Sequence, residues 1–146
     1  MDSSDVAAGL ERLVSLIRWL SPPGLSLTAA ATLTTLERSG PRRLTALAAD
    51  EGVTQPAMTQ LVGRLEVSGV VERCADPDDG RVVHVRLTDA GRELVARRRA
   101  ARADRLSGLL ATLSPADQEA LAAALPAINA LASAPRESLI DDWMEH

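Results

Sequence analysis

Residues 47–69, "LAADEGVTQPAMTQLVGRLEVSG", carry the strongest fold signal in this sequence. Two helices joined by a tight turn need a small residue where they cross, a glycine in the turn, and apolar residues that hold the second helix on the first. These residue types occur at the required spacing, as Ala48, Gly52, Val53, Met58 and Leu61. The stretch therefore predicts a helix-turn-helix, with a short helix over 45–50 and a second helix that Thr54 caps and Gly69 ends.

The outward side of the second helix carries side chains that can read DNA. Glutamine pairs with adenine edges, arginine with guanine or phosphate, and the methyl groups of alanine and threonine contact the thymine methyl. The free amides and the positive dipole end of the helix N-terminus favour a phosphate. None of the outward residues is acidic; they are Gln55, Pro56, Ala57, Thr59, Gln60 and Arg64. A solvated surface helix with no ligand is the alternative at this point.

A second pattern follows in "CADPDDGRVVHVRLTDAG", residues 74–91. Two β-rich runs flank a charged turn over 76–80, and His84 and Arg86 alternate with apolar neighbours, which predicts a hairpin with one wet face. Asp76, Pro77 and Asp78 are residues that build turns.

The turn of the hairpin places arginines where a neighbouring DNA groove would lie. A two-stranded hairpin beside a DNA-reading helix, called a wing, reaches the flanking minor groove. An arginine at its tip can enter this narrow groove, where the potential is most negative, and Arg81 is the candidate. Asp79 is expected to pair with Arg81 and fix its direction, and Arg73 on the entering strand is expected to meet phosphate. A solvated loop with a chance salt bridge is the alternative.

The segments outside these motifs are predicted to form helices. An amphipathic helix over 4–20 ends at Ser21-Pro22-Pro23-Gly24, and a second begins at the cap Thr28 and stops at Gly40-Pro41. A long helix is expected over 88–112, with five arginines on its exposed face: Arg97, Arg98, Arg99, Arg102 and Arg105.

The C-terminal part of the sequence predicts a last helix and an acidic tail. Ser114-Pro115, with Asp117 at the third helical position, is a good helix start. Pro126 lies inside the helix, so a kink or break is expected there. One short apolar turn is expected in the tail, from Leu139, Ile140, Trp143 and Met144.

Composition limits the classes of function. The 146 residues are 46% hydrophobic but only 1% aromatic, so the core must consist of aliphatic side chains. No apolar run approaches the roughly 20 residues of a membrane span, and the N-terminus lacks signal-peptide order, so a cytoplasmic protein is expected. The net charge is −4, yet residues 42–105 hold 12 arginines against 10 acids. Only this middle part is expected to face a polyanion.

Together, "LTALAADEGVTQPAMTQLVGRLEVSGVVERCADPDDGRVVHVRLTDAGREL", residues 44–94, closely resembles the MarR family of bacterial winged helix-turn-helix regulators. The DPxD turn followed by Arg, a strand ending in LT, and a glycine three residues after that threonine are the specific features. The resemblance implies a mainly α fold with a small β-wing and interlocking N- and C-terminal dimerisation helices. It divides the chain into a dimerisation helix over 1–24, a winged DNA-binding domain over 25–88, and dimerisation helices and tail over 89–146.

The resemblance also implies partners and site residues. Such homodimers bind a pseudo-palindromic double-stranded operator, mostly as repressors, and many release it when a small lipophilic or anionic effector binds. By position, the reading helix corresponds to Thr54, Gln55, Ala57, Thr59, Gln60 and Arg64; the wing pair to Asp79 and Arg81; and the phosphate-contacting helix start to Arg43 and Thr45. Trp19 and Arg18 are assigned to the effector pocket, with core or dimer packing as the alternative for Trp19. Gly80 replaces the second wing arginine of many relatives.

Other chemistry finds little support in the sequence. One Cys and two His make no dedicated metal site, and neither a nucleophile motif nor a glycine-rich phosphate loop is present, so neither an enzyme nor a cofactor is expected. Two alternatives remain for the function. One is a helical dimer that acts through protein partners, and the other is a regulator switched by oxidation of Cys74.

Overall fold

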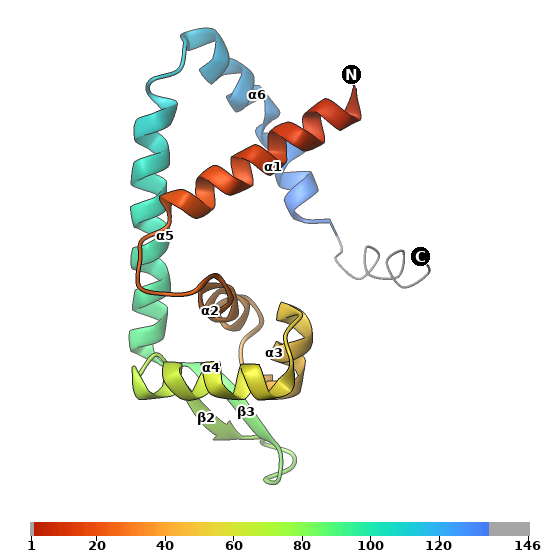
Figure 1. The fold of residues 1–146 in the computed structure, drawn as a ribbon, viewed down its shortest axis with the longest axis vertical. Coiled ribbons are helices and arrows are strands. Elements are labelled where there is room, and N and C mark those ends of the chain that lie inside the picture. Colours follow the sequence, from red (N-terminus) through yellow and green to blue (C-terminus); the bar gives the residue numbers. More distant parts are fainter. Residues whose placement is uncertain (1, 135–146) are drawn as a thin grey trace. The chain divides into compact units, whose positions relative to one another are not determined.

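The computed structural model describes residues 2–134, and Figure 1 shows their fold. Six helices and a small antiparallel sheet, in the strand order β1-β3-β2, make up the described chain. The elements are α1 Ser3–Leu20, α2 Leu27–Ser39, β1 Arg42–Arg43, α3 Leu44–Glu51, α4 Gln55–Val67, β2 Val71–Ala75, β3 Val83–Leu87, α5 Asp89–Leu110 and α6 Pro115–Ala132. The mainly α fold with a β-wing is confirmed. The chain divides into two compact units, and the boundary between them falls within α5, after Leu106.

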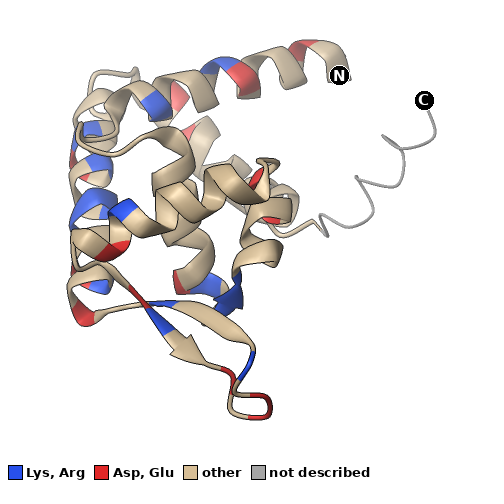
Figure 2. Cartoon of the chain, turned by 60° about the horizontal axis from the view of Figure 1, so that its bottom comes forward, with Lys and Arg blue, Asp and Glu red and all other residues tan. Residues whose placement is uncertain are grey.

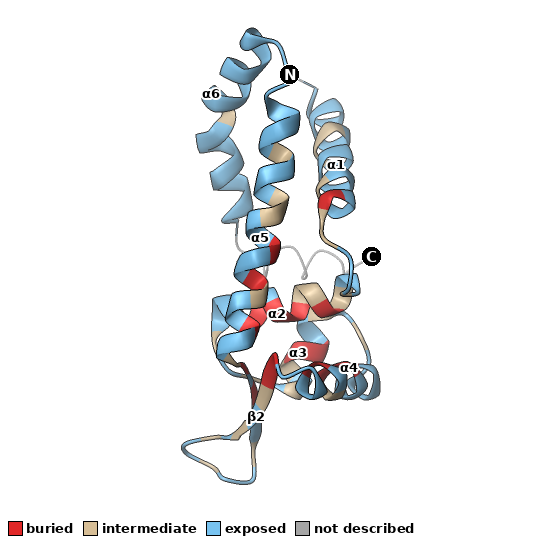
Figure 3. Cartoon of the chain, turned by 90° about the vertical axis from the view of Figure 1, so that its left-hand side faces the viewer, coloured by how far each residue is buried: buried red, intermediate tan, exposed pale blue. Residues whose placement is uncertain are grey.

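The core of the first unit is aliphatic, as the composition requires. Helices α2, α3 and α4 pack with the sheet and the first turns of α5, and Figure 3 shows their buried positions. The largest fully buried apolar side chains are Leu33, Leu47, Met58, Val62, Val71 and Val85. This core joins the helix-turn-helix and the hairpin into one body, so the two predicted DNA-reading elements are fixed on a common support.

The ends of the helices follow local capping chemistry, with one correction. Helix α2 begins at Leu27, because the hydroxyl of Ser26 accepts the Ala29 amide at 3.1 Å. The prediction that Thr28 caps this helix is therefore wrong: the Thr28 carbonyl instead accepts the Thr32 hydroxyl within the helix. Ser and Thr are both good caps, and the extended backbone at Ser26 decides between them.

Strand β1 is absent from the sequence prediction. Its two residues pair with β3, Arg42 opposite Val85 and Arg43 opposite His84. The side chain of Arg42 also forms an ion pair with Asp50 of α3. Its Nε lies 2.8 Å from Oδ2, and its Nη2 donates to Oδ1 at 3.1 Å. This short third strand attaches the hairpin to the helix-turn-helix.

The arginines of α5 are not all on an exposed face, contrary to expectation. Arg98 is buried, with 9% of its surface exposed, and donates to the Pro23 carbonyl at 3.4 Å. Arg105 donates to the Leu20 carbonyl at 2.7 Å, and Arg99 pairs with Glu37 of α2. The end of α1 and the segment after it are thus bound to α5 through arginine–carbonyl contacts.

Helix α6 is continuous through Pro126, so of the predicted kink or break, the break does not occur and the kink stays a prediction. Alanine and leucine around Pro126 are strong helix formers, which limits the effect of one lost hydrogen bond. The predicted start is confirmed, since the Ser114 hydroxyl accepts the Asp117 amide at 3.1 Å and donates to its carboxylate at 2.7 Å. The apolar turn predicted around Trp143 lies outside the described residues. None of the described helices is both long and apolar enough to cross a membrane.

Candidate nucleic-acid interface

Helix α4 presents its polar side outward because its apolar side is locked into the core. Met58, Leu61, Val62 and Leu65 are buried. The turn before α4 closes through Gly52, whose φ of +64° lies in the left-handed region that glycine tolerates best. The Thr54 hydroxyl then accepts the Ala57 amide at 3.3 Å, which confirms the predicted cap.

All the residues that are predicted to contact DNA from α4 lie on the side of this helix that faces away from the core. Each of them is exposed, and the first turn of the helix contains no acid; they are Thr54, Gln55, Pro56, Ala57, Thr59, Gln60 and Arg64. The Thr59 hydroxyl donates to the Gln55 carbonyl at 2.9 Å, within the helix. Arg43 and Thr45, at the start of α3, are exposed as well.

The hairpin of β2 and β3 carries the predicted arginine at its turn. Asp79 Oδ1 accepts both the Arg81 amide, at 3.1 Å, and the Arg81 Nε, at 3.3 Å, which confirms the expected contact. The Arg81 side chain is 93% exposed. In Figure 1, α4 and the hairpin lie at the same end of the first unit. The structure thus places the exposed side of α4 and Arg81 at one end of the same support.

Asp76 is the structural centre of the turn. Its Oδ1 accepts the amides of Asp78, at 2.8 Å, and Asp79, at 3.2 Å, while its Oδ2 lies 2.9 Å from His84 Nε2. The hydrogen bond from the Asp78 amide is the main reason that the pKa of Asp76 is lowered; the Asp79 amide, His84 and Arg43 act in the same direction, against partial burial. The turn predicted from Asp76, Pro77 and Asp78 is confirmed, but its link to His84 was not foreseen.

The other arginines of the hairpin have carboxylate partners within the chain. Arg73 Nε lies 3.7 Å from Glu66 of α4, and Arg86 Nε donates to Glu72 at 2.7 Å. The contact with Glu72 raises the pKa of Arg86 above its usual value. Arg73 keeps 42% of its side chain exposed, so the pairing leaves part of the guanidinium accessible. Figure 2 shows that acidic residues dominate the very tip of the hairpin.

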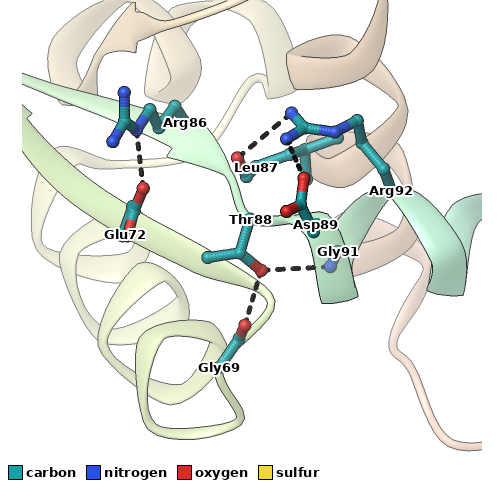
Figure 4. Close-up of polar contacts among 8 residues, drawn as sticks. All are labelled: Gly69, Glu72, Arg86, Leu87, Thr88, Asp89, Gly91 and Arg92. Atoms are coloured by element: carbon teal, nitrogen blue, oxygen red, sulfur yellow. Dashed lines mark hydrogen bonds and ion pairs between the residues drawn. The ribbon is translucent and has the colours of Figure 1, made fainter.

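A hollow of about 530 Å³ lies where the hairpin meets α5, and Figure 4 shows contacts around it. The Thr88 hydroxyl donates to the Gly69 carbonyl at 2.6 Å and accepts the Gly91 amide at 3.1 Å. Arg92 binds the Leu87 carbonyl at 3.4 Å and the Asp89 carboxylate at 2.5 Å. These contacts join the sheet to α5, a function that the sequence analysis did not assign to any of these residues.

The residues assigned to an effector pocket lie elsewhere, on the last turn of α1. Trp19 is 81% exposed, so packing in the core of a single chain is excluded for it. Arg18 is exposed too, and neither residue lines the hollow beside α5. Cys74 is a half-buried free thiol on β2. Among the described residues, no group of three or more His, Cys, Asp and Glu side chains is placed to hold a metal ion.

Comparison with known proteins agrees with this geometry. The profile of the MarR family matches residues 25–83. An HTH-type transcriptional regulator of Mycobacterium bovis is 36% identical over 130 residues, which is 88% of this chain and 91% of the relative.

Solved structures of regulators share the fold. A putative transcriptional regulator of Pseudomonas aeruginosa has a TM-score of 0.77 at 24% identity, over 91% of this chain and 94% of its own. MepR of S. aureus, bound to an oligodeoxyribonucleotide, has a TM-score of 0.59 at 22% identity and coverage of 75% and 80%. PcaV of Streptomyces coelicolor, in complex with its natural ligand, has a TM-score of 0.53 at 24% identity and coverage of 92% and 94%. This chain therefore belongs to the MarR family of helix-turn-helix transcriptional regulators.

Proposed function

We propose that two copies of this chain form a repressor that binds a pseudo-palindromic operator and releases it when a small anionic or lipophilic effector binds. The observation that carries the proposal is the exposed, acid-free first turn of α4 beside a wing whose Asp79 holds the exposed Arg81. The family supplies the mode of action, and a solved relative in the fold comparison is bound to DNA.

The dimerisation regions of this proposal are residues 1–24 and 89–146, which flank a DNA-binding domain over 25–88. Helices α1 and α6 support it, because each exposes apolar side chains that a single chain leaves in water. On α1 these are Val6, Leu13, Val14 and Leu16, and on α6 they are Leu121, Leu125, Ile128 and Leu131. Burial of such faces against a second copy is the association that the hydrophobic effect favours.

In this proposal, part of the binding free energy comes from contacts between α4 and the bases, and part comes from contacts between arginines and the DNA backbone. In a two-fold dimer, both α4 helices enter successive major grooves about one DNA turn apart. Arg43, Thr45, Arg64 and Arg73 are the proposed phosphate contacts, and Arg81 enters the flanking minor groove. Gln55, Ala57, Thr59 and Gln60 read base edges.

Affinity for the protein's own upstream DNA should fall steeply with salt. Each phosphate neutralised by an arginine releases condensed counterions, so we expect a slope of about −4 or steeper in log affinity against log salt concentration. Fluorescence anisotropy with a labelled duplex from 50 to 300 mM salt measures it, and a scrambled duplex is the control for specificity. A flat salt dependence, or equal affinity for both duplexes, would favour the alternative of a dimer that acts on protein partners.

The effector part of the proposal rests on the junction between α1 and α5. Arg98 is a buried cation, and no carboxylate among the described residues lies within 4 Å of it. Burial, and to a lesser extent Arg102, lowers its pKa below the usual value. An uncompensated buried charge is costly, and a bound carboxylate would satisfy it. Arg18 and Trp19 precede Leu20, whose carbonyl Arg105 holds, so the residues assigned to the pocket lie beside this junction in the chain.

An Arg98→Met variant should keep its fold and bind DNA but lose its response to anions. Methionine fills similar space without a charge, so the free energy of unfolding should change by less than about 2 kcal/mol in either direction. The measurement is operator affinity in rising benzoate, used as a probe of small aromatic carboxylates. Arg97→Met, at a 68% exposed side chain one residue away, is the matched control and should respond like wild type. Equal benzoate sensitivity in all three proteins would remove Arg98 from the effector site.

A further inference from the structure

The turn of the wing is held by one carboxylate that connects it to the opposite strand. Asp76 directly follows β2, and its amide donates to the Val82 carbonyl at 2.8 Å, while the two oxygens of its carboxylate have separate partners. Oδ1 binds the Asp78 and Asp79 amides, and Oδ2 faces His84 of β3 at 2.9 Å. The Asp76 and His84 side chains are only 14% and 20% exposed, so water competes little for this contact. The turn is therefore fixed from inside the hairpin.

The same set of contacts continues to the arginine at the wing tip. Asp76 binds the Asp79 amide, and the Asp79 carboxylate binds the amide and Nε of Arg81. The Arg81 side chain is 93% exposed, and Asp79 is the one acidic partner within 4 Å of it among the described residues. Its direction therefore depends on where Asp79 is held, and so on Asp76.

We propose that Asp76 and His84 are positioning residues for DNA binding by the wing, and that protonation of His84 strengthens the arrangement. This rests on the proposed function, because it assigns a task to Arg81 on the operator. With a protonated imidazole the contact becomes a charge-assisted hydrogen bond, which is shorter and stronger than a neutral one. Histidine is the side chain whose charge changes most readily between pH 5 and 8.

The groups around His84 determine how its charge acts. One of them is the Asp76 carboxylate, whose Oδ2 lies 2.9 Å from His84 Nε2. Strand pairing places Arg43 of β1 and Cys74 of β2 directly opposite His84 on either side. The pKa of Asp76 is lowered, mainly by the Asp78 amide, so this carboxylate remains charged between pH 5.5 and 8. Replacement of His84 therefore tests a pH response of the wing in that range without changing the Asp76 carboxylate.

Two readouts test the inference, one of them independent of DNA. Hydrogen exchange of the Asp78, Asp79 and Arg81 amides in the free protein reports the order of the turn. Operator affinity between pH 5.5 and 8 reports the effect on binding. Asp76→Ala should lose protection at these amides and about tenfold in affinity, since each of two wings must then order its arginine on binding.

Conservative variants separate positioning from simple damage. Asp76→Asn keeps an oxygen for the two amides, so protection should return to near the wild-type level. Wild-type affinity should rise toward pH 5.5, and both Asp76→Asn and His84→Gln should flatten this profile. Two variants are matched controls and should keep the wild-type profile. One is Asp78→Asn, because the Asp78 carboxylate makes no hydrogen bond or ion pair with the described residues, and the other is His146→Gln, at the other histidine of the sequence.

The outcomes are distinct. Unchanged exchange and affinity in Asp76→Ala would overturn the positioning role, and a wild-type profile in His84→Gln would overturn the part of protonation. If wild type itself does not bind its upstream DNA, the proposed function fails. Amide exchange in Asp76→Ala still decides in that case whether the carboxylate holds the turn.

Discussion

Replacing both Arg81 and Gln60 with alanine in each copy is expected to weaken operator binding by about a thousandfold or more, because a dimer then loses four contacts that are worth about 1 kcal/mol or more each. Both side chains are exposed, so the fold should be unaffected. The measurement is anisotropy with the upstream duplex, alongside thermal unfolding of the free protein, whose midpoint should remain near that of wild type.

The two single variants should fail in different ways. Arg81→Ala removes a charge, so the salt slope should become shallower, whereas Gln60→Ala should relax the preference for one base without changing that slope. Arg97→Ala, in α5, removes an exposed arginine away from the wing and serves as the control for net charge. Undiminished binding by the double variant would contradict the proposed contacts on α4 and the wing together.

The helix-turn-helix and the wing were predictable because their signals are local. Gly52 and Met58 act within a dozen residues of each other, and a turn that needs a left-handed φ favours glycine over other residues. Asp79 and Arg81 are two residues apart, so their contact follows from the geometry of the turn. In each case, the residues that determine the structure lie within the segment that they shape.

Contacts between distant segments were not predictable from the same patterns. Arg98 and Pro23 are 75 residues apart, and nothing near either residue indicates the other. Arg97, Arg98 and Arg99 are consecutive, and a helix turns about 100° per residue, so they cannot share one face. The expectation of one exposed arginine face overlooked that limit. Strand β1 was missed for a related reason, since two residues carry no periodicity and pair only once β3 is in place.

The candidate interface was predictable in outline, but not in its support. Every residue assigned to the reading helix is exposed on α4, since one buried stripe fixes the opposite face. His84 was read as a surface residue, because alternation along a strand gives its face but not its contact with Asp76. Trp19 was ambiguous for another reason: a residue that is exposed in one chain has its environment set by whatever binds there.

Gly91, near the start of α5, is the glycine that follows the strand ending in LT, one of the features typical of the family. The structure gives a physical reason for a glycine at this position. A Cβ at this position would lie 2.0 Å from the Val70 carbonyl oxygen and 3.0 Å from its carbon. That same oxygen accepts the Thr88 amide at 3.1 Å, and Thr88 in turn caps α5 (Figure 4). A methyl group can fit only if α5 moves away from the sheet, which would disturb the contacts that join them.

Gly91→Ala should therefore destabilise the protein by about 3 kcal/mol or more, because the clash is with backbone and no side-chain rotation can relieve it. In thermal unfolding the midpoint should fall by roughly 10 °C. Gly63→Ala is the matched control, since Gly63 lies within α4 and an added Cβ there meets nothing within 4 Å. That variant should be neutral or gain up to about 1 kcal/mol, as alanine favours helix over glycine. Equal midpoints for the two variants would mean that α5 does not lie against Val70 as closely as the structure has it.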